Sequence, residues 1–157
     1  MKTYVQVAQR LVLASLIILM IAGTSQWAAA QDAQSFKTFT SQVVVNQRQQ
    51  STASVGRFTL GDGSDGVSLL TDDVSLQIGN IALAIPAGSF NRIFTGGYLY
   101  FKTVGTMKIA VLIQPLGGAN YSYYAAVQGA VPGANPVAVS LAIGNDSGST
   151  SVNAYVY

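Results

Sequence analysis

The amino-acid sequence predicts an all-β protein: a single antiparallel β-sandwich of about eight strands, immunoglobulin-like or jelly-roll-like, preceded by a cleavable signal peptide. Three observations predict the sandwich. From Val55 onward, apolar residues alternate with polar or small residues at a period of two. Glycine, proline and Asn/Asp turn residues separate these runs at nearly even intervals. The same region has no convincing helical stretch, and many short, evenly spaced strands are typical of sandwiches and barrels.

The first half of this region contains four expected strands, around Phe58–Leu60, Val74–Ile78, Ile81–Ile85 and Tyr98–Val104. In the second of them, three aliphatic side chains share one face, and Ser75 and Gln77 share the other. Gly79-Asn80 is a turn signal that joins the second strand to the third. Pro86 ends the third strand because proline has no N–H to donate to the ladder.

The second half contains four more expected strands, at Met107–Ile113, Tyr121–Val127, Val137–Ile143 and Val152–Val156. Small alanines on the second face of several strands indicate that this face is also covered or lies flat against a neighbour. The last strand alternates apolar residues with Asn153, Tyr155 and Tyr157. An edge strand of that kind favours association with other chains.

Residues 31–53 differ in composition, because they are rich in Gln, Ser and Thr. Phe36, Phe39 and Val43 have helical spacing, whereas Val43-Val44-Val45 has strand propensity. Two interpretations therefore stay open: a flexible polar leader with one short element, or a strand that adds to the sheet of its own molecule or of a neighbour. The expected organisation is a signal peptide at 1–30, this segment at 31–53, and the sandwich domain at 54–157.

The N-terminus has the features of an export signal. Lys2 and Arg10 precede an apolar stretch of thirteen residues, Leu11–Gly23, and the following short region ends in Ala28-Ala29-Ala30. Small residues there predict cleavage between Ala30 and Gln31. An uncleaved anchor is the alternative, but this stretch at about 1.5 Å per residue is shorter than a hydrocarbon core of about 30 Å. We expect an exported protein, periplasmic, cell-surface or extracellular, that meets a membrane only through the signal.

Composition excludes several classes of protein. The 157 residues include no cysteine and no histidine, and all six acidic residues are aspartates. Disulfide frameworks, structural zinc sites, thiol catalysis and histidine acid–base dyads are therefore excluded. Without Lys2 and Arg10, the six remaining Lys and Arg residues balance the six aspartates, so the mature chain is nearly neutral. A neutral surface without a basic cluster predicts no nucleic-acid partner.

Two segments of the sequence echo each other. VSLQIGN at 74–80 recurs as VSLAIGN at 139–145, and each is a strand that runs into a Gly-Asn turn. Two copies are too few for a solenoid or an array. The echo predicts two strands that solve the same packing problem, for example in related positions of two sheets.

A series of turn motifs is distributed over three stretches of the chain: RFTLGDGSDGVSLLTDDVSLQIGNIALAIPAGSF, VLIQPLGG and NPVAVSLAIGNDSGSTSV. Together they resemble an uncharacterised module of bacterial secreted proteins, often found in tandem copies, with the pattern FTLG…IPAGSF…PLGG…NPVxVxLxIGxDxG. The resemblance covers residues 57–152, about three-quarters of the mature chain. It implies an all-β extracellular module with no established activity. This chain departs from the pattern by its single copy and by Asp72, where the module usually has Glu.

Aspartates supply the strongest candidate for a metal site. Gly61–Gly66 (GDGSDG) is the best polar cluster, and an extracellular calcium ion takes six to eight oxygen ligands. The spacing does not match an EF-hand loop, and Asp and Gly are also common in ordinary turns. The weak calcium candidates are Asp62, Asp65, Asp72, Asp73 and Asp146. No other cofactor is expected.

The mature chain is also rich in tyrosine, at Tyr98, Tyr100, Tyr121, Tyr123, Tyr124, Tyr155 and Tyr157. All of these except Tyr124 are candidates for an interaction surface. On a sheet, flat amphipathic rings form a platform for sugar stacking or protein contact. Tyrosine is also a favoured cross-strand partner, which is the structural alternative. Either way, Tyr98 and Tyr100 should share one face, as should Tyr121 and Tyr123.

We expect no enzyme activity and name no catalytic residue. The aspartate pairs Asp62/Asp65 and Asp72/Asp73 are the only acidic groups close in sequence, and no second proton carrier accompanies them. The expected function is that of an exported, non-catalytic structural or interaction module that associates with itself or with another exported protein through its sheet edges. The first alternative is a small carbohydrate-binding module that uses a tyrosine face. The second is a calcium-stabilised adhesion domain.

Overall fold

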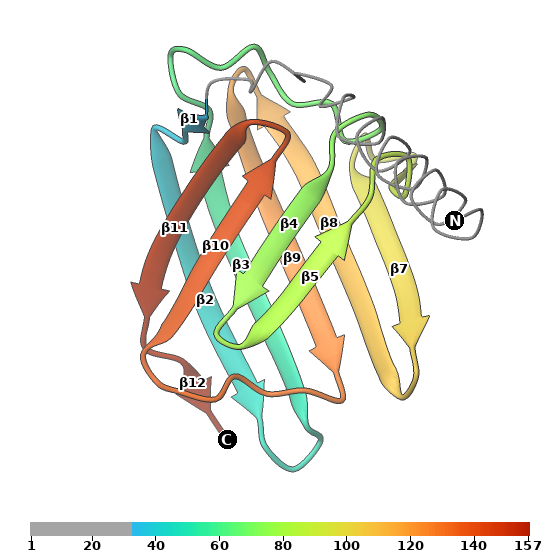
Figure 1. Ribbon diagram of the computed structural model, residues 1–157, viewed down its shortest axis with the longest axis vertical. Helices are drawn as coiled ribbons and strands as arrows, with labels where there is room; N and C mark the ends of the chain where they lie inside the picture. The colour runs from blue at the N-terminus through green and yellow to red at the C-terminus, as the bar shows by residue number, and fades with distance from the viewer. Residues whose placement is uncertain (1–32) are drawn as a thin grey trace, which may run out of the picture. The chain divides into compact units, whose positions relative to one another are not determined.

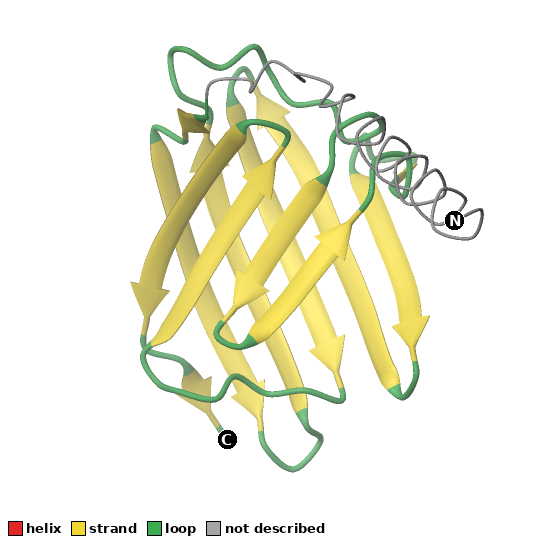
Figure 2. Cartoon of the chain, viewed as in Figure 1, coloured by secondary structure: helices red, strands yellow, loops and turns green. Residues whose placement is uncertain are grey.

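Residues 33–157, the part of the chain that the computed structural model describes, form two β-sheets that pack face to face (Figure 1). Every regular element among these residues is a strand (Figure 2). The structure confirms the all-β class and the two-layer sandwich. Within this range, no helix is long and apolar enough to span a bilayer. The expected signal peptide and its cleavage site between Ala30 and Gln31 lie outside the described residues.

The five-stranded sheet has the order β1-β11-β10-β4-β5. Its strands are β1 (Gln34–Ser35), β11 (Asp146–Val152), β10 (Val137–Ile143), β4 (Val74–Ile78) and β5 (Ile81–Ile85). β10 lies at the centre and pairs antiparallel with β11 and β4, whereas β1 pairs parallel with β11. Both β4 and β5 have the bounds that the sequence predicts.

The seven-stranded sheet has the order β12-β2-β3-β9-β8-β7-β6. Its strands are β12 (Tyr155–Val156), β2 (Thr38–Asn46), β3 (Ser51–Thr59), β9 (Asn120–Gln128), β8 (Met107–Gly117), β7 (Tyr98–Val104) and β6 (Asn91–Arg92). All pairs in this sheet are antiparallel except β12 with β2, which is parallel.

The prediction of about eight antiparallel strands was wrong in number and in direction. The described residues contain twelve strands in two mixed sheets. Three of the strands, β1, β6 and β12, have only two residues each, which is too short to leave a period-two signal. The boundary drawn at residue 54 lies inside β3, and the segment before it supplies β1 and β2.

The two parallel pairs arise because the chain changes sheets near both of its ends. After β1, the chain passes through Phe36 and Lys37 and joins the other sheet as β2. After β11, it passes through Asn153 and Ala154 and joins the other sheet as β12. Gly148 of β11 makes the first crossing possible, because a Cβ there would lie 2.6 Å from a ring carbon of Phe36.

The core fills the space between the inner faces of the two sheets. Ile78, Ile143 and Val111 are completely buried, and aromatic rings fill one side of the core. The ring of Phe36 stacks on Phe58 at a centroid distance of 4.6 Å, and Phe58 stacks on Tyr121 at 5.1 Å. This stack fixes the position of the chain where it crosses from β1 to β2.

The two echoing segments are neighbours in one sheet and do not lie in two different sheets. They coincide with β4 and the last residues of β10, which pair antiparallel so that Leu76 lies opposite Leu141. Each continues through a Gly-Asn turn into the next strand, with positive φ at Gly79 (61°) and Gly144 (57°). Asn80 and Asn145 do not have a positive φ, and a positive φ at the first turn residue alone is the type II′ geometry that joins antiparallel strands tightly.

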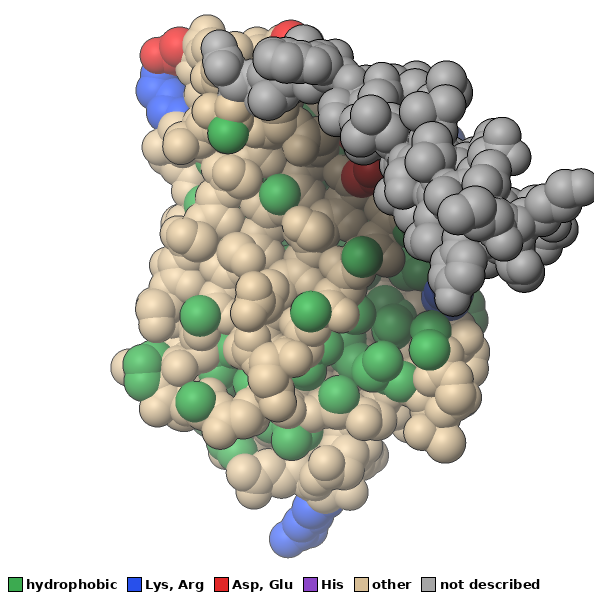
Figure 3. Space-filling view, viewed as in Figure 1, with side chains coloured by type: hydrophobic (Ala, Val, Ile, Leu, Met, Phe, Trp, Pro, Cys, Tyr) green, Lys and Arg blue, Asp and Glu red, His purple; other side chains and the backbone are tan. Residues whose placement is uncertain are grey.

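The outer face of the five-stranded sheet is small, polar and uncharged. The side chains that its four long strands place there are Ser75, Gln77, Ala82, Ala84, Ala138, Ser140, Ala142, Ser147, Ser149 and Ser151. Figure 3 shows this face: over β10 and β11 it is mostly tan, with separate hydrophobic side chains in green. The sequence predicted that this alanine-bearing face is covered or lies flat against a neighbour, but in the single chain Ala82, Ala84 and Ala138 are exposed and Ala142 is half-buried.

Candidate interaction surface

Four of the six tyrosines that the sequence placed on an interaction surface instead face the interior. Tyr100 and Tyr123 are buried in the core, and Tyr98 and Tyr121 pack against it half-buried. Each pair shares a face, as the alternation predicts, but that face is the inner one. Tyr155 and Tyr157 are exposed.

Hydrogen bonds explain how Tyr123 is accommodated in the core. Its hydroxyl donates to Ser41 Oγ at 2.7 Å and lies 3.0 Å from Ser54 Oγ. Gly56 leaves room for the ring, because a Cβ there would lie 2.5 Å from it. Burial raises the pKa of Tyr123 above its usual value of 10.0, and the two serine hydrogen bonds oppose that rise.

The candidate calcium ligands do not come together. Within residues 33–157, no group of three or more acidic, histidine or cysteine side chains is close enough to hold a metal ion. Asp65 is an exposed residue of the 61–66 loop. Three other aspartates bond locally: Asp62 pairs with Lys37 Nζ at 3.1 Å, Asp72 accepts from Ser68 N at 2.6 Å, and Asp73 accepts from Ala87 N at 2.8 Å. These are the contacts of ordinary turn and surface aspartates.

Asp146 differs from the other aspartates because it is completely buried. Its Oδ2 accepts a hydrogen bond from Ser64 Oγ at 2.8 Å, which ties the 61–66 loop to the start of β11. Its Oδ1 has no hydrogen-bond partner among the described residues. One carboxyl group cannot replace the six or more oxygen ligands of calcium, so Asp146 acts in this structure as an anchor for the loop.

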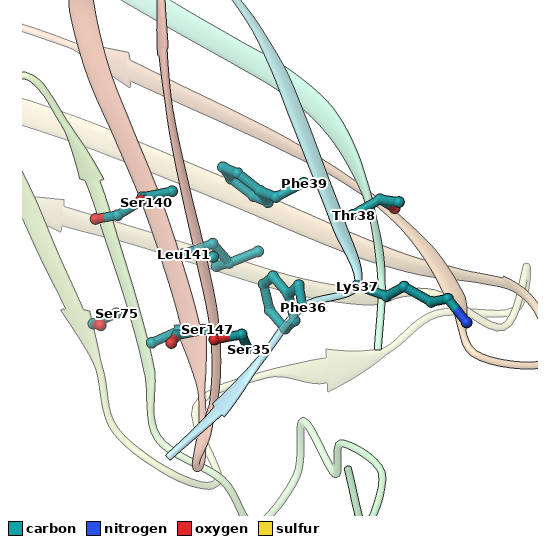
Figure 4. A pocket seen from close by; sticks show the side chains of 12 residues that line it. Ser35, Phe36, Lys37, Thr38, Phe39, Ser75, Ser140, Leu141 and Ser147 are labelled. Carbon is teal, nitrogen blue, oxygen red and sulfur yellow. The ribbon is translucent and has the colours of Figure 1, made fainter. Parts of the chain in front are cut away.

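A hollow of about 470 Å³ lies at the side of the sandwich where β1 leaves β11. Serines of both strands line it, and Figure 4 shows Phe36, Phe39 and Leu141 beside one another, with Lys37 extending away from them. Lys37 is the one charged residue of the lining, and its ammonium group pairs with Asp62. The lining therefore offers hydroxyl groups but no acid–base pair.

The outer face of the seven-stranded sheet carries two neighbouring apolar rows. The strand registers place four large apolar side chains in one line across β3, β9, β8 and β7: Val55, Tyr124, Leu112 and Leu99, beside which Gln42 takes the same position on β2. We call this line the ridge row. Two residues further along each strand, a second line follows: Tyr155, Val44, Ala53, Ala126, Ala110 and Phe101. We call this line the trough row, and the two rows together the apolar band.

Exposure distinguishes the apolar band from the core. Phe101 and Tyr155, at the two ends of the trough row, are 66% and 69% exposed, and Val55 and Tyr124 of the ridge row are 45% and 44% exposed. The ten positions of the band, each about 4.8 Å by 6.8 Å, cover roughly 330 Å². An exposed apolar patch of about 300 to 600 Å² is the largest on a typical monomer and is often functional.

Polar rows border the band on both sides. Beyond the ridge row lies the line Thr40, Arg57, Ser122 and Gln114. Beyond the trough row lies the line Asn46, Ser51, Gln128, Lys108 and Thr103. We call these lines the polar rims. Each contains a single charged residue, and both charges are positive.

The surface of the band is uneven because its two rows differ in side-chain size. The middle of the trough row consists of three alanines, whereas the ridge row beside it has branched and aromatic side chains. A hollow of about 330 Å³ opens over this part of the face, lined by Val44, Ala53 and Ala126 together with Tyr124 and Tyr157. A second hollow, of about 480 Å³, lies between Val55 and the rim residues Thr40 and Arg57.

The sequence did not predict this surface. Tyr155 belongs to the predicted interaction surface, but Tyr124 does not, and no role was predicted for Val55, Leu112 or Phe101. The signal for Tyr124 was present, because it is adjacent to Tyr123 and must therefore point to the opposite face of the same strand.

No model of a known protein family matches the chain, and neither a curated protein nor a solved structure does.

Proposed function

We propose that this protein is an exported, non-catalytic structural or interaction module that works through contacts of its sheet faces, with the apolar band as the main contact surface. The observation that carries the proposal is the band itself: ten apolar or aromatic residues in register across six strands of an exposed face. Covering such a surface is favourable, at about 2.5 kcal/mol for each 100 Å² of apolar area removed from water.

Features of the sequence support export and a non-catalytic role. The apolar stretch Leu11–Gly23, followed by Ala28-Ala29-Ala30, has the form of a cleavable signal. The likeness of residues 57–152 to a secreted bacterial module agrees with that compartment. The chain lacks histidine, cysteine and glutamate, and most of its aspartates bond to turns, to a loop or to Lys37. The protein thus lacks three of the side-chain types that carry protons or act as nucleophiles in enzymes.

The test is to disrupt the band and follow the protein in the cells that make it. Tyr124→Lys places a charge at the centre of the ridge row, and Ser140→Lys places the same charge on the outer face of the other sheet. Wild type and Ser140→Lys are expected to fractionate with an assembly or with the cell envelope, and Tyr124→Lys with unassembled protein. If Tyr124→Lys is folded and distributes as wild type does, the band is not the contact surface.

One observation favours a second candidate function, the binding of a neutral carbohydrate. The hollow of about 330 Å³ combines the exposed rings of Tyr124 and Tyr157 with the amide side chains of Asn46, Gln49 and Gln128. Aromatic rings stack on the apolar faces of sugars, and amides donate to and accept from their hydroxyl groups.

A glycan array separates this function from the first. A carbohydrate site predicts binding of a neutral oligosaccharide that Tyr157→Ala abolishes. The matched variant Phe101→Ala, at the other end of the trough row, should leave that binding intact. An array without signal, or a signal that survives Tyr157→Ala, would rule the carbohydrate site out.

A further inference from the structure

On the basis of the proposed function, we infer that the partner of the apolar band is a second copy of this chain, related to the first by a two-fold axis. The axis lies parallel to the face of the seven-stranded sheet and runs across the strands, between the ridge row and the trough row. Such a dimer uses the same surface on both copies, so the surface must be complementary to itself.

The side chains of the band have this self-complementarity. Rotation about the proposed axis keeps each strand opposite itself and exchanges the two rows. Tyr124 of one copy then lies over Ala126 of the other, because both belong to β9. On β3, Val55 lies over Ala53 in the same way, and on β8, Leu112 lies over Ala110. On β2, the amide of Gln42 lies over Val44. Three large side chains therefore meet three alanines, and each contact occurs twice.

The Phe101 end of the trough row also meets an apolar side chain. On β7, the axis brings Leu99 of one copy over Phe101 of the other. Phe101 is 66% exposed in the single chain, and this contact covers it. Large side chains that fill gaps between small ones produce the close packing of specific interfaces.

Charges on the polar rims agree with the same axis. The rotation exchanges the two rims, so Arg57 of one copy faces Ser51 of the other on β3. Lys108 likewise faces Gln114 on β8. The two cations of the rims therefore meet neutral polar partners and avoid each other, whereas like charges in contact would cost several kcal/mol.

The area is sufficient for a stable dimer. With its two rims and Gln42, the face presents twenty positions of about 4.8 Å by 6.8 Å, or roughly 650 Å². A specific protein–protein interface of standard size buries a total of about 1,200 to 2,000 Å², or about 600 to 1,000 Å² on each partner. The area of this face alone thus lies within the standard range.

Single cysteines test the axis directly, because the chain has none of its own. Ser122 and Gln128 lie at the two ends of the face on β9, outside the band, and the axis places each opposite the other in the partner copy. Facing sheets pack about 10 Å apart, within reach of a thiol cross-linker of that length. Two copies of the same cysteine would be about 20 Å apart, since six residues at about 3.4 Å separate them.

The expected result is therefore specific to the mixture. Ser122→Cys mixed with Gln128→Cys gives cross-linked dimer, whereas either variant alone gives little. As a matched control, Ser140→Cys on the other sheet gives none in any combination. A mixture that cross-links no better than its separate components overturns the proposed axis.

Sedimentation equilibrium of the purified chain provides the second readout. Ala126→Lys places a charge in the trough and is expected to raise the dissociation constant about a hundredfold or more, whereas Ser140→Lys leaves it unchanged. A wild-type chain that stays monomeric at about 1 mM overturns the dimer. That result leaves the proposed function intact if Tyr124→Lys still changes the fractionation in cells. A normal dimer together with unchanged fractionation would instead remove the proposed function.

Discussion

At the scale of single residues, Asp146 is the buried group that most needs hydrogen bonds from the rest of the sandwich. A buried carboxyl group loses its hydration, and the protein must replace that hydration with hydrogen bonds. Ser64 provides one such bond across 82 positions of sequence, from a loop that also contains two exposed aspartates. The polar cluster that looked like a metal-binding loop is thus a loop held in place by a buried acid.

Ser64→Ala is expected to destabilise the protein by about 1 to 3 kcal/mol, because it leaves both oxygens of a buried carboxyl group without a partner. Urea unfolding measures the change. Ser151→Ala, on the exposed face of β11, is the matched control and should stay within about 0.5 kcal/mol of wild type. Equal stability of the two variants would show that the Ser64 bond contributes nothing.

The Tyr123 hydroxyl predicts how stability depends on alkaline pH. Its pKa is raised in the folded state, so the folded protein retains this proton at a pH at which the unfolded chain loses it. The contribution is therefore fully present below pH 10 and is lost as the pH rises through the raised pKa. Burial also raises the pKa of Tyr121, with smaller effects from Tyr98 and Asp146, so the two tyrosines act in the same direction.

Unfolding free energies measured between neutral pH and about pH 11 test this prediction. Wild type is expected to lose stability above pH 10, and Tyr123→Phe to lose less over the same range. At neutral pH, Tyr123→Phe costs about 1 kcal/mol, because its hydroxyl bond to Ser41 is gone. An identical alkaline slope in both proteins would contradict the role assigned to Tyr123.

At the scale of elements, the sequence predicted best those strands whose two faces differ clearly. β4 and β5 alternate branched aliphatic residues with small or polar ones, and their predicted bounds agree with the structure. β2 was ambiguous because the segment is rich in Ser, Thr and Gln, and because Phe36, Phe39 and Val43 have helical spacing while Val43-Val44-Val45 has strand propensity. What decides its conformation is distant in sequence: Phe39 packs on Tyr123 of β9, with ring centroids 5.8 Å apart.

The crossing from β1 to β2 depends on the absence of a side chain at Gly148. Gly148→Val would place atoms where the ring of Phe36 lies, and we expect a loss of about 1 to 3 kcal/mol. The strain acts on β1, so the amides of Gln34 and Phe36, which donate to Asn145 O and Ser147 O, should lose protection from hydrogen exchange. Ser149→Val, which points outward from the same strand, should change neither. Unchanged protection in Gly148→Val would show that the crossing tolerates a side chain there.

At the scale of the whole molecule, the apolar band could not be found from the sequence because it depends on the register between strands. Alternation along β9 places Tyr124 on the face opposite Tyr123, and that much is visible in the sequence. That Val55 and Leu112 lie beside Tyr124 follows from pairings with β3 and β8, and period-two patterns leave such pairings open. Alternation also does not show which face of a strand lies inside, and four of the tyrosines predicted on an exposed surface face the interior.

A dimer of the whole molecule also predicts a thermal signature. Because association stabilises only the folded chain, the unfolding midpoint of wild type should rise with protein concentration. Ala126→Lys should show a midpoint that does not depend on concentration, and Ser140→Lys should behave as wild type does. Calorimetry over a hundredfold range of concentration measures the difference. A midpoint of wild type that is constant over this range would contradict association through the band.

The exchange of short strands between the two sheets has a consequence for the timing of folding. β1 is held by β11, and β12 by β2, so each of these pairings joins residues more than 100 positions apart in the chain. Contacts of such long range form late, because a long loop must close first. β1 cannot pair before Asp146 and Ser147 have been synthesised, and β12 cannot pair before Tyr155 and Val156 have been synthesised. We therefore expect the chain to stay incompletely folded until then, which suits the passage through a narrow channel that the proposed export requires.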